Sequence, residues 1–380
     1  MDFSWSDEEQ QLYERTLAFF SHLKVVTDKP LVSRTSDVWR AMGEFGVLGV
    51  AVDASHGGLG LTPLQTVHMT EAIGLGINNF GLAFAALAHA FACVEPIAKF
   101  CTPEIRETWL PRLLSGDAVG ANAITEAEAG SDAFALHTEA VRDGSDYVIS
   151  GVKSYVSNGP ASDILLVYAS TNKNAGLLGV SAFVIPTNMK GVTLGKPFDG
   201  MGLDCAPIGP VYFDACRIPG SSLLGHEGSG AQIFRHSMQW ERTGLFGAYV
   251  GLAQRMLERS IVYAKERIQG DVAIGKHQAI SHRIANMQTR IESARCLLYR
   301  AAWSITHEDR NRSEMLVSSA KLHVSEMAVS TAMDAIAIHG GMGCMRDVGI
   351  ECALRDSIPS TIFSGTSDIQ RNAIAAHLGL

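Results

Sequence analysis

The spacing of apolar residues changes twice along the chain and divides it into three stretches. From Ser6 to about residue 120, apolar residues recur at helical spacing, and Ser6 followed by Glu9 is typical of a capping box at a helix start. Between about residues 122 and 223 the pattern changes to short β-rich runs separated by turn residues. Helical spacing returns after Gly228 and continues with few interruptions to the end of the chain.

The middle stretch predicts a small β domain, either a barrel or a sandwich. Asp143-Gly144 is typical of a hairpin turn. Because helices and strands are segregated, a doubly wound nucleotide fold is disfavoured, and no G-x-G-x-x-G follows a strand to indicate an NAD site. The sequence therefore predicts an α+β protein with a helical domain at 1–120, a β domain at 121–223 and a second helical domain at 224–380. Strands are expected at residues 147–149, 163–168, 180–185 and 211–213.

Composition narrows the class of protein. The chain has 380 residues, of which 47% are apolar and 18% charged, so it can form a large core and two or three domains. A formal net charge of −8 argues against a nucleic-acid partner, because phosphate neutralisation needs clustered Lys and Arg. The apolar stretch at 80–93 is interrupted by His89 and is shorter than the roughly 20 residues of a membrane span. No membrane partner is therefore expected.

The chain has seven cysteines, an odd number, with no Cys-x-x-Cys pair and no histidine at zinc-ligand spacing. We therefore expect free, mostly buried thiols and no metal site. The start of the chain is acidic and lacks an apolar segment, which predicts that no secretory signal is present and that the protein is cytoplasmic.

Glu241 is the first candidate for chemistry. None of its helical neighbours three and four positions away is basic, so its carboxylate is expected to turn inward, where desolvation raises its pKa. The alternative is a surface glutamate with an ordinary adjacent arginine, and neighbour composition leaves the two open. Glycines on the same side of the helix would let another element approach closely. These glycines are Gly244, Gly247 and Gly251, and the other neighbours are Ser237, Met238 and Leu245.

Three glycine-containing segments are candidates for ligand contacts. In the segment 122–132, hydroxyls and a glycine suit the edge of a flat heterocycle, although by itself a linker turn is the preferred interpretation. The segment 153–159 is a strand entering a turn, in which Tyr155 offers a stacking surface or, as is commoner, a packed strand residue. The segment 339–343 admits a pyrophosphate, and a turn between two helices explains it equally well.

In order and spacing, these segments resemble the acyl-CoA dehydrogenase superfamily over nearly the whole chain. Residue 364 departs from that family, because Ser364 stands where most members carry a catalytic glutamate. A hydroxyl without an activating partner cannot remove a proton from carbon at neutral pH, so the chain is inactive or its base lies elsewhere. The other matching stretches are 45–49, 57–60, 110–113, 124–132 and 361–370.

The resemblance implies an N-terminal helical domain, a central β domain and a C-terminal four-helix bundle, with FAD between the β domain and the bundle near a dimer interface. It also implies a homo-oligomer, expected to be a dimer of dimers. By matching positions, the isoalloxazine would meet Asn122, Ile124, Thr125, Gly130, Ser131, Tyr155 and Ser157. The ADP part would meet Arg267, Gln278 and Gly341 of a neighbouring subunit, and Thr366 and Asp368 would complete the pocket.

Two departures concern the neighbouring-subunit contacts. After Arg267, where the family usually has Phe-Gly-Lys-Pro, the chain has residues 270–273, Gly-Asp-Val-Ala, which removes an aromatic contact and adds a negative charge. Ala337 stands where a glutamine is common.

The resemblance also indicates where the base has moved. In the branch similar to isovaleryl-CoA dehydrogenase, the glutamate comes from the bundle helix immediately before an arginine, and Glu241-Arg242 falls at that position. We therefore predict Glu241 and Arg242 as the catalytic pair. The segments 88–93, 122–126, 238–242 and 355–366 together look like the L-prolyl-carrier-protein dehydrogenases, which oxidise a proline thioester on a peptidyl carrier protein.

Three functions are compatible with the resemblance. The first is oxidation of a carrier-bound prolyl thioester, with oxygen or a flavoprotein as the electron acceptor. The second is a short branched-chain acyl-CoA dehydrogenase, which needs a site for the CoA nucleotide. The third is a catalytically silent binding or assembly protein.

Overall fold

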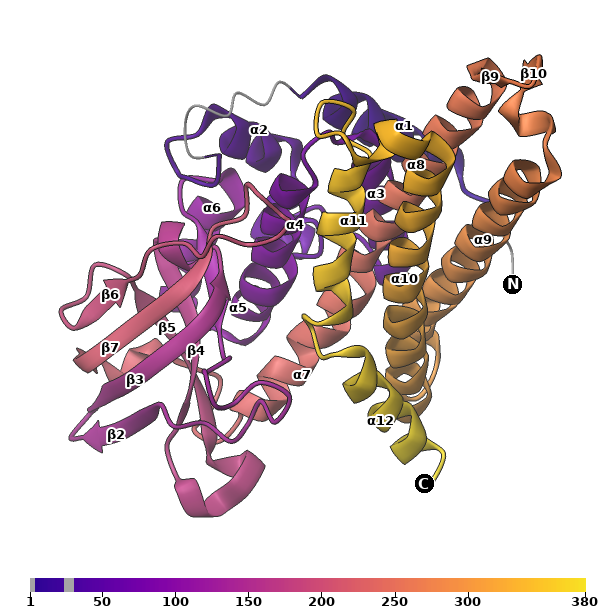
Figure 1. The fold of residues 1–380 in the computed structure, drawn as a ribbon. Coiled ribbons are helices and arrows are strands. Elements are labelled where there is room, and N and C mark those ends of the chain that lie inside the picture. The colour runs from indigo at the N-terminus through magenta and orange to yellow at the C-terminus, as the bar shows by residue number, and fades with distance from the viewer. Residues whose placement is uncertain (1–3, 24–30) are drawn as a thin grey trace.

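The computed structural model describes residues 4–23 and 31–380. Figure 1 shows the three parts in the predicted order, with N-terminal helices above, a β domain at the lower left and long helices on the right. The N-terminal helices are α1 (Asp7–His22), α2 (Asp37–Phe45), α3 (Pro63–Gly76), α4 (Phe80–Ala88), α5 (Glu95–Phe100) and α6 (Pro103–Ser115). The predicted capping box is confirmed: the Ser6 side chain accepts from the Glu9 amide, and the Glu9 carboxylate accepts from the Ser6 amide.

A π-helical segment, η3 (His89–Val94), joins α4 to α5 in one continuous helix. Among the described residues, the run Phe80–Phe100 is the one helix long and apolar enough to cross a membrane, with 21 residues and a mean hydropathy of 1.6, and its apolar window is entirely buried inside the protein. The expectation that this stretch is shorter than a membrane span was wrong, because the helix continues past His89 to Phe100. His89 lies in the core, where its Nε2 lies 3.1 Å from the Leu113 carbonyl and its Nδ1 accepts from the Gly120 amide at 2.9 Å.

The middle part is an eight-stranded sheet in the order β6-β7-β3-β2-β4-β5-β8, with β1 paired to β4. The four predicted strand regions are confirmed, and so is the hairpin at Asp143, where Gly144 adopts a φ of 65° between β2 and β3. The strands are β1 (Gly120–Ala123), β2 (Glu139–Asp143), β3 (Asp146–Ser157), β4 (Ile164–Ser170), β5 (Val180–Pro186), β6 (Val192–Leu194), β7 (Ile208–Ile218) and β8 (Leu223–Leu224).

Strand β4 separates two cores. Its odd-numbered residues, Leu165 and Val167, pack inside the β domain with residues of β3, β5 and β7. Its even-numbered residues, Leu166 and Tyr168, face a second cluster that includes residues of η3, α6 and α7. Both faces of this strand are therefore buried, which explains its nearly unbroken apolar sequence.

The C-terminal part is a helical bundle in which α8, α9 and α10 pack together and α3 packs against α8. The bounds are α7 (Gly230–Trp240), α8 (Phe246–Glu266), α9 (Gln278–His307), α10 (Arg310–His339), α11 (Glu351–Ser357) and α12 (Ser367–His377). A short hairpin of β9 (Ile268–Gln269) and β10 (Val272–Ala273) joins α8 to α9. Gly270 and Asp271 have φ of 62° and 63°, so the hairpin turn lies at the first two residues of the departure at 270–273.

The predicted close approach along the glycines of α8 is confirmed. A Cβ atom at Gly251 would lie 2.0 Å from the Glu71 carbonyl oxygen of α3, and one at Gly247 would lie 2.2 Å from Thr70 Oγ1. Two backbones therefore meet where these side chains are missing, as they do where Gly74 of α3 faces Ala248.

All seven cysteines are free thiols. The expectation that most are buried was only partly right. Cys93, Cys101 and Cys216 are buried, Cys205 and Cys352 are half-buried, and Cys296 and Cys344 are exposed.

Candidate functional site

Glu241 is the first residue of a second π-helical segment, η7 (Glu241–Leu245), which joins α7 to α8 and packs against η3. Such segments widen a helix by one residue and often occur at functional sites. The Glu241 side chain is 8% exposed, so the inward orientation is confirmed and the surface alternative is wrong. Ser364, the residue at the usual glutamate position, donates its hydroxyl to Glu241 Oε1. The two positions considered for the base therefore lie in direct contact.

Donors from three elements hold the backbone around Ser364, and two of them, Lys321 and Gln370, are fully buried. Arg242 Nε donates to the Ser364 carbonyl at 2.8 Å, and Lys321 Nζ donates to the Gly365 carbonyl at 2.7 Å. Gln370 Nε2 donates to the same two carbonyls at 3.2 and 3.0 Å. Together these contacts fix the segment that carries Ser364. We refer to Ser364 and Gly365 as the C-terminal turn and to Arg242, Lys321 and Gln370 as its clamp.

Lys321 was missed in the sequence. It lies on α10, fully buried, with its ammonium 5.5 Å from the centre of the Phe246 ring. Its helical neighbours three and four positions away, Val317, Ser318, Val324 and Ser325, include no acidic residue. The reasoning that selected Glu241 therefore applies equally to this lysine.

Burial controls the protonation of these groups. Desolvation raises the pKa of Glu241, against the hydrogen bond from Ser364 and the positive charges of Arg242 and Lys321. Desolvation, assisted by the charge of Arg242, lowers the pKa of Lys321 to about 7. Desolvation also lowers the pKa of Arg242. A carboxylate whose pKa is moved toward neutrality can accept a proton from carbon more effectively than an ordinary surface glutamate.

Aromatic rings surround the C-terminal turn. Phe363 lies 5.0 Å from Phe84, 5.7 Å from Phe246 and 6.1 Å from Tyr249, measured between ring centres. This cluster excludes water on the bundle side and anchors the residue that precedes Ser364.

The segment 122–132 leaves β1 and runs along the β domain. A buried ion pair fixes it: Lys153 Nζ donates to Glu126 Oε1 at 2.7 Å and to the Ile124 carbonyl at 3.0 Å. Glu126 also accepts from the amides of residues 137 and 138, and the Ser154 amide donates to the Thr125 carbonyl at 2.8 Å. The segment is therefore an ordered support on the β domain, which the preferred interpretation as a linker turn did not anticipate.

One buried polar group and two exposed residues of this support are candidates for ligand contacts. Asn122 Oδ1 is buried without a hydrogen-bond partner in the described part of the chain. Gly130 and Ser131 are exposed, and a Cβ atom at Gly130 would meet nothing within 4 Å. Ile124 is buried, and Thr125 is partly buried.

Tyr155 is 65% exposed and has a φ of 54°, so the interpretation as a packed strand residue was wrong. Its ring lies 5.3 Å from that of Phe198, and Ser157, two residues further along β3, is partly buried. Left-handed backbone is uncommon for a residue other than glycine, and at a ligand site it redirects a side chain out of the strand. Tyr155 therefore presents a free aromatic face.

The remaining predicted residues lie elsewhere. Arg267 and Gln278 flank the β9–β10 hairpin, which Figure 1 shows at the opposite end of the molecule from β2 and β3. Gly341 is exposed in a 3₁₀-helical segment, η9 (Gly340–Cys344), directly after α10. Thr366 caps α12, and Asp368 is exposed and paired with Arg371 at 3.1 Å. One protomer therefore does not bring Arg267 or Gln278 to the segment 122–132.

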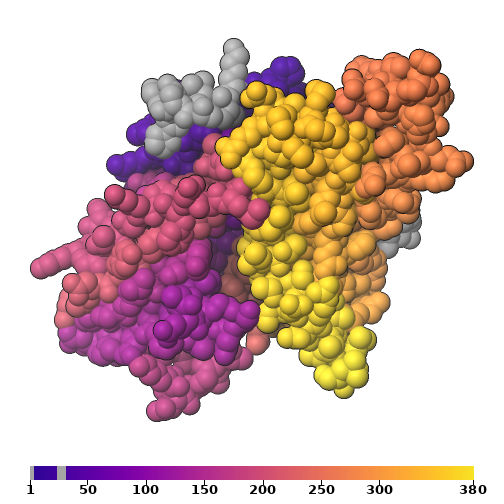
Figure 2. Space-filling view, in the orientation of Figure 1, coloured from indigo at the N-terminus to yellow at the C-terminus, as the bar shows by residue number. Residues whose placement is uncertain are grey.

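Figure 2 shows a furrow where the magenta β domain meets the yellow C-terminal segment, which carries the C-terminal turn. The residues predicted for a flavin fit such a group on the β side: Asn122 offers an unused acceptor, Gly130 offers open space and Tyr155 offers an uncovered ring. Flat heterocycles are held by hydrogen bonds at the edge and aromatic contact at the face.

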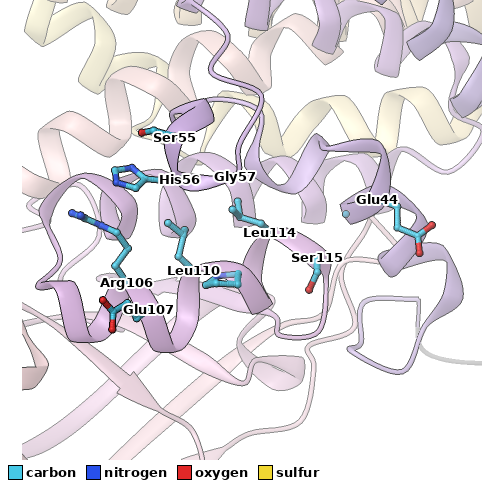
Figure 3. A pocket seen from close by; sticks show the side chains of 11 residues that line it. Glu44, Ser55, His56, Gly57, Arg106, Glu107, Leu110, Leu114 and Ser115 are labelled. Carbon is cyan, nitrogen blue, oxygen red and sulfur yellow. The ribbon is translucent and has the colours of Figure 1, made fainter.

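A separate hollow lies on the N-terminal part of the chain. A surface hollow of about 600 Å³ lies between α2, α6 and the turn at 55–57, with His56 and Arg106 on its wall (Figure 3). It contains none of the predicted site residues. We place the site by the predicted residues, among which Glu241 has a raised pKa and Asn122 an unused acceptor, and none of the predicted residues lines this hollow.

Models of known protein families match all three parts of the chain. Models of the acyl-CoA dehydrogenase N-terminal, middle and C-terminal domains match residues 6–117, 121–216 and 228–379. The chain belongs to the acyl-CoA dehydrogenase family. A relative within this family, described as an L-prolyl-[peptidyl-carrier protein] dehydrogenase of Pseudomonas fluorescens, is 46% identical over 348 residues and covers 91% of each chain.

Two solved structures are similar to this chain over nearly its whole length. "PigA with FAD and proline" has a TM-score of 0.95 at 36% identity and covers 100% of both chains. The prolyl acyl carrier protein oxidase AnaB has a TM-score of 0.93 at 35% identity, covering 99% of this chain and 100% of its own. The predicted family and fold class are thereby confirmed.

Proposed function

We propose that this protein is an FAD-dependent dehydrogenase that oxidises a prolyl thioester carried by a peptidyl carrier protein. The observation that carries the proposal is the buried Glu241 carboxylate, which contacts Ser364. This carboxylate supplies a base on the bundle side of the furrow. The names of similar proteins support the substrate class.

FAD fits the β side of the furrow and, when bound, supplies the acceptor for a hydride equivalent. We assign its isoalloxazine contacts to Asn122, Ile124, Thr125, Gly130, Ser131, Tyr155 and Ser157, with Thr366 and Asp368 completing the pocket. Arg267, Gln278 and Gly341 would serve the neighbouring subunit, because in one protomer Arg267 and Gln278 flank the hairpin at the far end of the bundle. This assignment requires a homo-oligomer, for which we propose a dimer of dimers.

In this mechanism Glu241 removes the proton from the α-carbon of the thioester. Arg242 holds the C-terminal turn and keeps positive charge close to the carboxylate. The ring cluster around Phe363 keeps water from the bundle side of the site. Each of these groups is already in place in the folded chain, so little reorganisation is needed when the substrate binds.

The test is incubation of the protein with a prolyl-loaded carrier protein and, in parallel, with isovaleryl-CoA. Mass spectrometry of the carrier protein should show loss of hydrogen from the prolyl group, and the mass lost reports whether one or two pairs of hydrogens leave. Oxidation of isovaleryl-CoA alone would favour the acyl-CoA function, which the position of Glu241-Arg242 also suits. Turnover with and without oxygen separates oxygen from a flavoprotein as electron acceptor.

The role of Glu241 has its own test. Glu241→Gln should retain FAD but lose flavin bleaching by substrate by at least about a hundredfold, because general bases contribute 10²–10⁴-fold. Bleaching at the wild-type rate would refute the assignment of the base. We also propose a cytoplasmic location, which would be tested by measuring the activity in the cytoplasmic fraction of a cell extract.

A further inference from the structure

Ser364 has a backbone conformation that does not favour serine. Its φ is 54°, and that of the following Gly365 is 91°, so two successive residues are left-handed. Glycine adopts such a conformation freely, whereas a residue with a Cβ atom is disfavoured there. The backbone alone would therefore select glycine at 364. The serine needs an explanation in its side chain.

Within the part of the chain that the structure describes, that side chain has one hydrogen-bond partner, the Glu241 carboxylate. No other side chain or amide of the described residues 4–23 and 31–380 donates to either oxygen of this carboxylate. The Ser364 hydroxyl donates to Oε1 of Glu241. Oε2 therefore has no donor among the described residues and is available to accept a proton. A carboxylate held by one hydrogen bond keeps a defined direction, which a base acting on carbon requires.

The clamp fixes the position of the hydroxyl. Arg242, Lys321 and Gln370 hold the two carbonyls of the C-terminal turn from α10, α12 and the π-helical segment. Because both carbonyls are restrained, the turn cannot rotate without breaking contacts to buried donors. The serine hydroxyl is therefore presented to Glu241 by a rigid support.

The charged and titratable groups around Glu241 come from several elements. Arg242 lies next to it in the π-helical segment, Lys321 faces it from α10 and Tyr168 lies near it on β4. The two cations favour the carboxylate form, as does the hydrogen bond from Ser364, while burial opposes it. Loss of the hydroxyl should therefore move the titration of Glu241 to higher pH.

We propose that Ser364 is a positioning residue that directs the Glu241 carboxylate and keeps Oε2 free for the proton taken from the substrate. The inference rests on the proposed role of Glu241 as base. Ser364 stands where most family members have the catalytic glutamate. The inference gives this serine a function, which is to position the glutamate that this chain carries at residue 241.

The experiment compares Ser364→Ala with Ser364→Gly. Both variants remove the hydroxyl, but only glycine also relieves the left-handed backbone, so a shared effect belongs to the hydroxyl. In the holoenzyme, infrared difference spectra between pH steps follow the protonated carboxyl, and the band missing in Glu241→Gln identifies Glu241. We expect its titration midpoint to rise by about one pH unit in both variants, the size of one lost hydrogen bond.

A second measurement is the pH dependence of flavin reduction, whose acid limb should move in the same direction. Ser304→Ala is the matched control, because that buried hydroxyl donates only within its own helix at 2.6 Å. A wild-type midpoint in both Ser364 variants would overturn the inference, and so would a shift in the alanine variant alone. The infrared readout does not require turnover, so failure of the proposed function, seen as an active Glu241→Gln, is recognised separately.

Discussion

The two sides of the furrow differ in how far the chain completes them by itself. On the bundle side, Arg242 and Lys321 hold the C-terminal turn, and Ser364 of this turn donates to Glu241. Aromatic rings surround the turn. On the β side, Asn122 keeps an unused acceptor and Tyr155 is exposed. The folded chain therefore buries the base in its core, whereas the β side of the furrow stays open for a ligand. Substitutions in the bundle should therefore change the stability of the fold, whereas substitutions of the open residues on the β side should change ligand binding.

The supports of the two sides also differ. The segment 122–132 depends on one buried ion pair, in which burial lowers the pKa of Lys153 to about 8 while pairing outweighs burial and holds the pKa of Glu126 at about 2. Both groups are charged at neutral pH. In the bundle, by contrast, α3 and α8 meet by direct backbone contact.

The largest effect on folding is expected for Lys153→Met. It leaves the Glu126 carboxylate buried without its cation, which costs about 3–5 kcal/mol. Urea unfolding measures the loss. Lys173→Met is the control, because its ion pair with Glu139 is at the surface and contributes at most about 1 kcal/mol. Equal losses in the two variants would mean that the buried pair is not the support of the segment 122–132.

The second largest effect is expected in the pH dependence of the stability that the ion pair of Lys153 and Glu126 contributes. Because the folded protein holds the pKa of Glu126 at about 2, below its ordinary value of 4.5, the stabilisation is complete above pH 4.5 and is lost as the pH falls toward 2. The difference in unfolding free energy between wild type and Glu126→Gln should shrink by about 3 kcal/mol across that window. Glu128→Gln is the neighbouring exposed control and should show no such change. A constant difference over this range would contradict the ion-pair description.

A smaller loss is expected on the bundle side for Gly251→Ala. The added Cβ would lie 2.0 Å from the Glu71 carbonyl, and backbone cannot move aside without separating α3 from α8. Overpacking of this kind costs about 1–3 kcal/mol, which exceeds the gain in helix propensity of up to about 1 kcal/mol. Thermal unfolding should show a lower midpoint. Gly130→Ala on the β side has open space and should leave the midpoint of the FAD-free protein unchanged.

The sequence predicted features that depend on neighbours in the chain. The capping box at Ser6, the hairpin at Asp143 and the alternation of strands and turns each have a local physical cause, and the structure contains them. The inward orientation of Glu241 followed from the absence of a basic helical neighbour, which is also local. The order of helices, sheet and helices could be predicted for the same reason.

Features that depend on distant contacts could not be predicted in this way. Lys153 and Glu126 are 27 positions apart and Ser364 and Glu241 are 123 apart, so neither contact leaves a pattern in the sequence. Neither the amino-acid composition of the two π-helical segments nor the spacing of their apolar residues distinguishes them from an α-helix. His89 was interpreted as an interruption because its partners, Leu113 and Gly120, come from later elements.

The smallest effect on folding is expected for Tyr155→Ser. The ring is exposed, so its loss should change the unfolding free energy of the FAD-free protein by no more than about 0.5 kcal/mol. If the ring covers a face of the flavin, FAD should bind about two- to tenfold more weakly, as expected for loss of one aromatic contact. Fluorescence titration of the FAD-free protein measures the affinity, and Phe198→Ser separates a direct contact from disturbance of the neighbouring ring. Reduced stability with unchanged affinity would mean that Tyr155 supports the β domain, and the two sides of the furrow would then differ less than the structure indicates.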